Sequence, residues 1–144
     1  MYNQKVLEIF KNPSNVGGLQ GANGSAKLEG DNGAEVVKLY ILADENEIIT
    51  NARFKTMGNV MSIVASSVAT ELMIGKSVKN AQNITRQDIL EVLGEVDIKE
   101  YKYIDLVLEN LSLTCEDFFK RKAKEEEKAR LEAEKLALLE KDKQ

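Results

Sequence analysis

The segment of residues 52–76 restricts the fold more than any other part of the chain. Residues 52–56 are typical of the end of a strand, Gly58 supplies a tight turn, and the run that follows carries almost no charge before Glu71. A helix that is apolar or small on nearly every side has to be buried over most of its surface. The sequence therefore predicts a central helix laid against a sheet. The turn at residues 57–59 meets the helix N-terminus, where backbone N–H groups lack intrahelical partners, so a binding site is favoured there.

Two further runs predict the rest of the sheet. Residues 34–43 (AEVVKLYILA) and 48–56 (IITNARFKT) alternate apolar and polar side chains near a period of two, and the polar residues 44–46 join them as a hairpin. The segment of residues 15–33 is rich in glycine and asparagine and predicts a loop that leads into a short strand at residues 25–29. We therefore predict an α+β fold in which a three-stranded antiparallel sheet is packed against helices.

Helical patterns surround this predicted sheet in the sequence. An apolar face over residues 2–11 ends before Pro13, because the residue before proline disfavours the α conformation. A second short helix is expected to begin after the N-cap Thr85 and to stop at Gly94. A third helix is expected to begin at Tyr103. Its buried stripe recurs at three and four residues and comprises Leu106, Val107, Leu111, Cys115 and Phe118.

The composition changes at residue 119, where lysine, glutamate and alanine become dominant. Opposite charges stand at helical spacing in this tail, but each such pair contributes only about 0.2–0.5 kcal/mol. We therefore divide the chain into a domain of residues 1–118 and an exposed, fraying helical extension of residues 119–144. Leucines near the end offer a partner-binding stripe, but they supply fewer than two heptads, so a solvated helix is the preferred interpretation. These leucines are Leu131, Leu136, Leu138 and Leu139.

Charge and cysteine content exclude several classes of protein. The net charge is −4 and the pI is near 5.1, whereas nucleic-acid binding requires a basic surface. One cysteine forms no internal disulfide. We expect no leader, because MYNQKVLEIF has neither a basic stretch nor an apolar h-region, and no membrane span, because no apolar run is long enough to cross a bilayer. We expect a cytoplasmic protein with no nucleic-acid or membrane partner. Because the chain has no histidine, neither Cys115 nor the Ser66–Ser67 pair has an activating base. We therefore interpret Cys115 as an inert core residue and the two serines as small residues that allow close packing of helix and sheet.

A resemblance to a known family rests on residues 52–71, which read ARFKTMGNVMSIVASSVATE, and on the GKSVKNA that follows. This stretch resembles the NifU/IscU-type iron-sulfur cluster assembly scaffold family (the NifU N-terminal domain). The similarity begins at KVLEIFKNPSNVGGL and reaches about Leu111. It implies a scaffold that receives iron and sulfide and passes a cluster on, without catalysing a reaction of its own. The implied partners are a cysteine desulfurase or other iron-sulfur assembly proteins; a homo-oligomer is a further possibility.

The family's ligand positions are all substituted in this chain. Family members hold a cluster or zinc with three cysteines and an aspartate, and the resemblance places Gly33 at the first cysteine and Glu35 at the aspartate. The second cysteine position is Asn59, and the third is Tyr103 or a residue next to it. Glu35 is the one oxygen donor left as a candidate metal ligand. A lone carboxylate does not hold iron or zinc tightly, so we interpret Glu35 as a solvated residue on a strand and expect no cofactor from this chain alone.

Two functional hypotheses follow. In the first, the protein is scaffold-like, has lost its cluster-ligating cysteines, and acts as a partner-binding or regulatory paralogue in iron-sulfur cluster assembly. In the second, it is a structural or interaction module without an iron-sulfur role, which presents its charged helix or a homodimer face. A metal-dependent enzyme built on Glu35 ranks last, because no spacing of His, Asp or Glu supports it. A stable complex with a cysteine desulfurase would distinguish the first hypothesis from the second.

Overall fold

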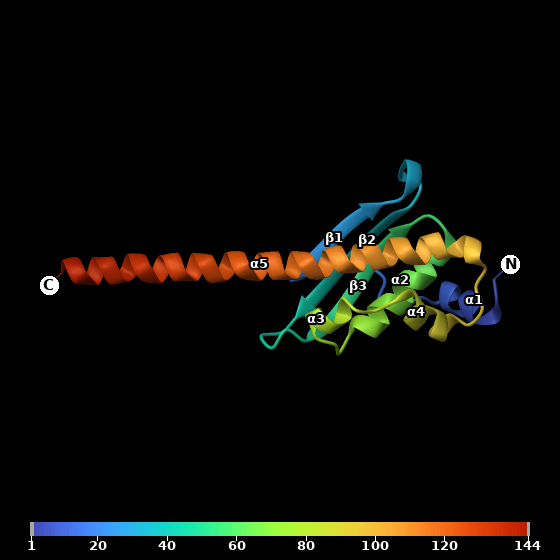
Figure 1. Cartoon of the computed structure of the whole chain (residues 1–144), viewed down its shortest axis with the longest axis horizontal. Helices are drawn as coiled ribbons and strands as arrows, with labels where there is room; N and C mark the ends of the chain where they lie inside the picture. Colours follow the sequence, from blue (N-terminus) through green and yellow to red (C-terminus); the bar gives the residue numbers. More distant parts are fainter. Residues whose placement is uncertain (1, 144) are drawn as a thin grey trace.

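Three antiparallel strands form the sheet of this computed structural model, which describes residues 2–143 (Figure 1). They are β1 (Gly24–Glu29), β2 (Val36–Ala43) and β3 (Ile49–Met57), in that order across the sheet. Every second residue of β2 is buried, as the period-two pattern predicts, so one face of the sheet is covered and the other reaches solvent. The buried set is Val37, Leu39, Ile41 and Ala43. The predicted three-stranded sheet is confirmed.

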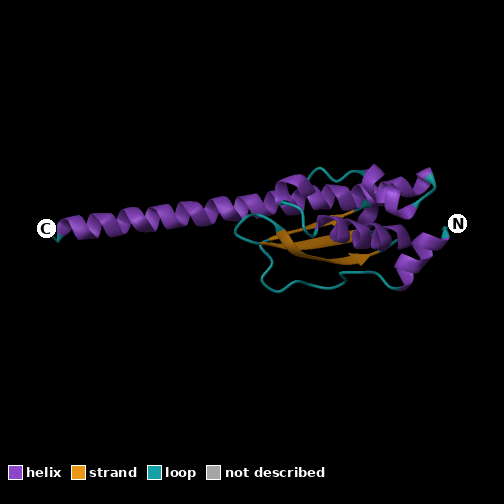
Figure 2. Ribbon diagram, turned by 90° about the horizontal axis from the view of Figure 1, so that it is seen from below, coloured by secondary structure: helices purple, strands orange, loops and turns teal. Residues whose placement is uncertain are grey.

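The helix α2 (Val60–Met73) covers the buried face of the sheet together with α5 (Tyr101–Asp142) (Figure 2). Most residues of α2 are buried, and its small side chains allow a close approach to β3. The Ser66 hydroxyl lies 3.1 Å from the Thr56 hydroxyl of β3 and donates to the Ser62 carbonyl at 2.7 Å. The buried central helix predicted from residues 52–76 is confirmed.

Three shorter helices complete the covering layer. The helix α1 (Gln4–Lys11) is the first element of the chain. The helix α4 (Arg86–Leu93) begins after the predicted N-cap Thr85, which forms a capping box with Asp88. Between α2 and α4 lies α3 (Val78–Ala81), a single turn that the sequence analysis did not separate from its surroundings.

The C-terminal helix α5 is one unbroken element that starts two residues earlier than predicted, at Tyr101, and continues past residue 118. Leu106 was expected in its buried stripe but is only half-buried, and Ile104 takes that place. From residue 123 to residue 143 every side chain is exposed, and this part of α5 extends beyond the body (Figure 1). Despite the length of α5, no helix within residues 2–143 is apolar enough to cross a lipid bilayer. The buried residues of α5 are Ile104, Val107, Asn110, Leu111, Thr114, Cys115 and Phe118.

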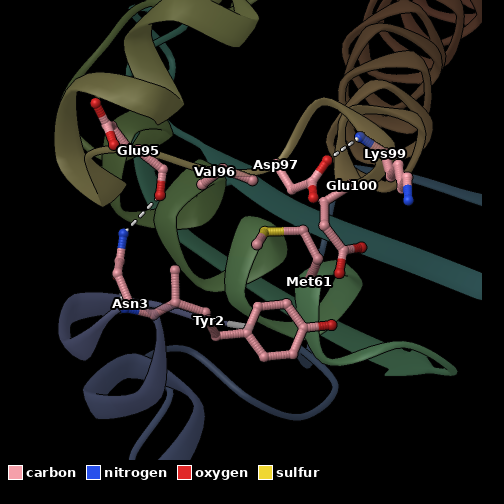
Figure 3. Close-up of a pocket in the computed structure, with 9 residues that line it drawn as sticks. Tyr2, Asn3, Met61, Glu95, Val96, Asp97, Lys99 and Glu100 are labelled. Carbon is pink, nitrogen blue, oxygen red and sulfur yellow. Dashed lines mark hydrogen bonds between the residues drawn. The ribbon is translucent and has the colours of Figure 1, made fainter.

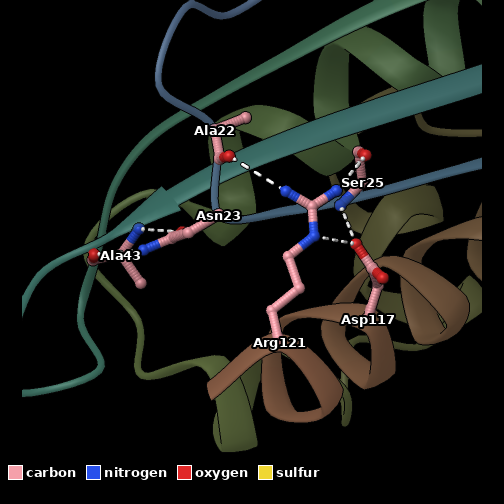
Figure 4. Close-up of polar contacts among 6 residues, drawn as sticks. All are labelled: Ala22, Asn23, Ser25, Ala43, Asp117 and Arg121. Atoms are coloured by element: carbon pink, nitrogen blue, oxygen red, sulfur yellow. Dashed lines mark hydrogen bonds and ion pairs between the residues drawn. The ribbon is translucent and has the colours of Figure 1, made fainter. Parts of the chain in front are cut away.

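A polar cluster fixes α5 to the start of β1 where the helix leaves the body (Figure 4). Arg121 donates to the Ala22 carbonyl at 3.2 Å and to the Ser25 hydroxyl at 3.0 Å. The same guanidinium pairs with Asp117 at 2.9 Å, and this carboxylate accepts the backbone N–H of Ser25 at 2.9 Å. Because α5 and the start of β1 each contribute donors and acceptors, the cluster anchors α5 at the point where its exposed part begins.

Candidate functional site

Of the four positions that the resemblance predicts as family ligand positions, Asn59 and Glu35 lie at the N-terminus of α2. Asn59 is the N-cap of this helix, and its side-chain oxygen accepts the Met61 backbone N–H at 2.8 Å. The first residue of β2, Val36, pairs with Met57 at the end of β3. Since Glu35 directly precedes Val36, this pairing brings Glu35 to the turn that leads into α2.

The Glu35 carboxylate covers the first turn of α2. Both of its oxygens accept the Asn59 backbone N–H, at 2.9 and 3.1 Å, and one of them also accepts the Ser62 hydroxyl at 2.9 Å. A carboxylate in this place satisfies donors that have no partner inside the helix and interacts favourably with the helix dipole. Our interpretation of Glu35 as a solvated strand residue is therefore wrong. It is a half-buried capping residue that stands one position before β2.

Gly58 makes room for this carboxylate. Its φ is +131°, a conformation that side chains rarely adopt, and a β-carbon at this position would overlap the carboxylate of Glu35. A side chain at residue 58 and the observed position of Glu35 therefore exclude each other. The tight turn predicted at Gly58 thus has a second role, which is to admit the cap.

Tyr103 lies in the first turn of α5 and lines, together with Glu35, an open pocket of about 440 Å³. The side chains of Asp105 and Leu106 also line this pocket. Asp105 is held by Arg86 of α4 through two charge-assisted hydrogen bonds, at 2.6 and 2.9 Å. Within residues 2–143, no three His, Cys, Asp or Glu side chains are grouped as a metal-ligand set.

Gly33 lies in the turn before Glu35 and stays outside these contacts. It ends the 3₁₀ turn Asp31–Gly33 with a φ of +70°, after Asn32 with a φ of +60°. A β-carbon at Gly33 would meet only a Glu29 oxygen, at 3.9 Å. The structure thus brings Glu35 and Asn59 into contact, places Tyr103 in the pocket that Glu35 lines, and leaves Gly33 in the adjoining turn.

Tyr2 is a residue of this site that the sequence analysis missed. Its hydroxyl donates to the Asn59 side-chain oxygen at 3.2 Å, and it lines a second pocket, of about 300 Å³, together with Met61 and Glu100 (Figure 3). Burial, followed by the nearby Glu100 carboxylate, raises the pKa of Tyr2 to about 12. The hydroxyl therefore remains a donor throughout the neutral range. No sequence signal connects Tyr2 to Asn59, because 57 positions separate them and only folding brings them together.

The side chains at the N-terminus of α2 do not provide the metal ligands that an iron-sulfur cluster or a zinc ion requires. Clusters are held by thiolates, and zinc sites take several nitrogen, sulfur or oxygen ligands in a tetrahedral set. The one carboxylate here, Glu35, already accepts hydrogen bonds with both oxygens. The single thiol of the chain, Cys115, lies about 18 Å along α5 from Tyr103, given a rise of 1.5 Å per residue. Cys115 is buried, and burial, assisted by Glu116, raises the pKa of its thiol to about 12, which disfavours a thiolate.

Comparisons with known proteins identify sequence relatives over nearly the whole chain. The family model for the NifU-like N terminal domain matches residues 1–125. The iron-sulfur cluster assembly scaffold protein IscU of Aquifex aeolicus is 35% identical over 131 residues, which is 90% of this chain and 83% of the relative. The IscU scaffold protein of Escherichia coli K12 is 38% identical over 101 residues, which is 68% of this chain and 79% of the relative.

Solved structures share the same fold at lower identity. A putative iron-sulfur cluster assembly scaffold protein for the SUF system from Fervidobacterium islandicum has a TM-score of 0.65 at 20% identity, over 79% of this chain and 96% of that one. A NifU-like N-terminal protein from Brucella abortus has a TM-score of 0.65 at 14% identity, over 82% and 94% of the two chains. These structures show the shared fold, and the family model over residues 1–125 shows that the chain belongs to the NifU-like N-terminal domain family.

Proposed function

We propose that this protein acts in iron-sulfur cluster assembly as a member of the IscU/NifU scaffold type that binds assembly partners without holding a cluster on its own side chains. The family match over residues 1–125 and the scaffold names of its relatives support the assignment to cluster assembly. The substitutions at Gly33, Asn59 and Tyr103 support the loss of cluster holding, because none of these residues supplies a thiolate. We assign the protein no reaction of its own.

One observation carries the proposal, namely the position of the Glu35 carboxylate over the first turn of α2. A scaffold has to leave its ligands open for incoming iron and sulfide. Here the donors of that turn are satisfied from within the chain, by hydrogen bonds of 2.9 Å from Asn59 and Ser62 to Glu35. The first turn of α2 already has its partners and the body is complete without cargo, which suits a protein that docks or regulates rather than one that carries.

The test is complex formation with a cysteine desulfurase from the same cell. Purified full-length protein and desulfurase are mixed anaerobically, and the mixture is examined by analytical size exclusion with iron and sulfide analysis of each peak. We expect a stable complex in which this chain carries neither iron nor sulfide. A variant that lacks residues 123–144 serves as the control, since docking through the folded body should survive this deletion. Absence of any complex would contradict the proposal.

A second candidate function, a pure interaction module, is favoured by the exposed part of α5. Residues 123–143 contribute no side chain to the core, yet they form a long helical extension of the body that carries four exposed leucines. Under this alternative, the deletion of residues 123–144 would abolish self-association or partner binding, and the desulfurase would not bind. The full-length protein and the variant that lacks residues 123–144, each mixed with the desulfurase, therefore distinguish the two candidate functions.

A further inference from the structure

The solvent-facing side of the sheet carries a row of three lysines. Lys27 of β1 pairs directly with Lys38 of β2, and Lys38 pairs directly with Lys55 of β3. Because directly paired residues point to the same face and neighbouring strands lie about 4.8 Å apart, the row runs about 10 Å across the sheet. Val37 and Leu39, on either side of Lys38, are buried against the helices, so the row lies on the face away from α2 and α5 (Figure 2).

A fourth cation adjoins this row. Arg53 pairs with Tyr40 in the next row on the same face, and its guanidinium donates to the Val16 carbonyl at 3.4 Å. The Lys38 ammonium lies 5.2 Å from the centre of the Tyr40 ring. We call Lys27, Lys38, Lys55 and Arg53 the basic face.

The chain neutralises little of the basic face. Lys27 pairs with Glu29 at 3.7 Å, and both side chains of this pair are more than half exposed. Within residues 2–143, Lys38, Lys55 and Arg53 form no ion pair. Like charges directly opposite on neighbouring strands destabilise a sheet. In a chain with 24 acidic and 20 basic residues, this concentration of positive charge is unfavourable for the isolated protein and favourable toward an anionic partner.

We propose that the basic face docks an acidic helix of a partner protein. Glutamates at i and i+3 or i+4 on a helix lie about 5–6 Å apart, close to the strand spacing of about 4.8 Å. A helix laid across the strands would therefore set one carboxylate over each of Lys27, Lys38 and Lys55. The basic face shares no residue with the Glu35 site, so the inference stands apart from the proposed function.

Nucleic acid fits the basic face less well than an acidic helix does. Sequence-tolerant binding of single strands uses aromatic side chains on which bases stack, and the one aromatic residue of this face, Tyr40, has the Lys38 ammonium over its ring. The net charge of −4 also repels a long polyanion, whereas a short helix with a few carboxylates experiences mainly the local field.

The experiment uses the full chain and a defined probe. A fluorescein-labelled alanine peptide with glutamates at helical i, i+4 spacing is titrated by fluorescence anisotropy at low and at physiological salt, beside a glutamine peptide of the same length. We expect the glutamate peptide alone to bind, with an affinity that falls as salt rises. The triple variant Lys27→Gln/Lys38→Gln/Lys55→Gln should weaken binding about tenfold, from the loss of three exposed ion pairs.

A matched variant, Lys124→Gln/Lys128→Gln/Lys135→Gln, removes the same charge from the exposed part of α5 and should change the affinity less than about twofold. Equal losses in both variants would overturn the proposal, since the peptide would then respond to net charge alone. Tighter binding of a single-stranded oligothymidylate of equal charge would overturn the proposal in favour of nucleic acid. Self-association of the protein that is abolished in the sheet variant, Lys27→Gln/Lys38→Gln/Lys55→Gln, would overturn it in favour of a second copy of this chain.

Two further readouts keep the test independent of folding defects. Circular dichroism melts should give the sheet variant a melting temperature equal to or above that of the wild type, because the substitutions relieve like-charge repulsion. The charge-reversed variant Lys27→Glu/Lys38→Glu/Lys55→Glu should bind a lysine peptide that the wild type does not bind. A charge-reversed variant that folds and ignores the lysine peptide would overturn the proposal.

Discussion

Removal of the Glu35 carboxylate tests the capping role that the structure assigns to it. In Glu35→Ala, the Asn59 N–H and the Ser62 hydroxyl lose a charged acceptor at 2.9 Å. A hydrogen bond to a charged group contributes about 1.5–3 kcal/mol, and a half-buried site lets water replace part of that. Together with about 0.5 kcal/mol from the helix dipole, we expect Glu35→Ala to lower the free energy of unfolding by about 2–3 kcal/mol.

The isosteric variant Glu35→Gln separates charge from shape. Its amide oxygen still accepts the Asn59 N–H, while the interaction of a full negative charge with the helix N-terminus is lost. We expect a loss of about 1 kcal/mol for this variant, between the wild type and Glu35→Ala.

The assay is urea unfolding followed by tyrosine fluorescence. All four tyrosines lie in the folded body and none lies in the exposed part of α5, so the signal reports the body alone. With an m-value of about 2 kcal/mol/M, Glu35→Ala should lower the midpoint by about 1 M. Glu29→Ala is the matched control, because its exposed ion pair with Lys27 at 3.7 Å should contribute less than about 0.5 kcal/mol. A Glu35→Ala variant as stable as this control would refute the capping role.

Three further predictions follow from the same geometry. Gly58→Ala should lower the free energy of unfolding by at least about 2 kcal/mol. In the Glu35→Ala background the loss should be smaller, because the carboxylate that the new β-carbon would overlap is then absent, and strictly additive losses in urea unfolding would contradict this. Alkylation of Cys115 by iodoacetamide at pH 8 should be at least about 100-fold slower in the folded protein than in urea, and its rate should rise with pH toward 12; equal rates would disprove its burial. Deletion of residues 123–144 should reduce helical circular dichroism and leave the tyrosine-detected midpoint unchanged, whereas a lower midpoint would show that the body extends past residue 122.

The sheet and the central helix were predictable because both depend on local periodicity. The alternation in β2 and the nearly uncharged run of α2 each indicate which surfaces are buried. The Thr85 capping box is likewise a short-range signal, because its residues lie three positions apart. The assignment of the family's ligand positions to Gly33, Glu35, Asn59 and Tyr103 rests on the resemblance alone and stays a prediction.

The contacts of the site were not predictable, because they depend on pairing between distant segments. Glu35 reaches α2 only because Val36 pairs with Met57, and Tyr2 reaches Asn59 only because α1 folds beside α2. In α5 the buried face could be inferred only from the spacing of apolar residues. The buried Asn110, which donates to carbonyls of β1 and β2, gives no apolar signal.

Iron and sulfide reconstitution tests the central claim most directly, namely that a cluster-scaffold body persists here without the ligands that hold a cluster. The purified protein is incubated anaerobically with ferrous iron, sulfide and thiol, desalted, and analysed for bound iron and sulfide beside a family member that has three ligand cysteines. We expect the cysteine-bearing relative to retain both elements and this protein to emerge without either, while its circular dichroism remains that of the folded state. Stoichiometric iron and sulfide on this chain, lost on Glu35→Ala substitution, would contradict the account.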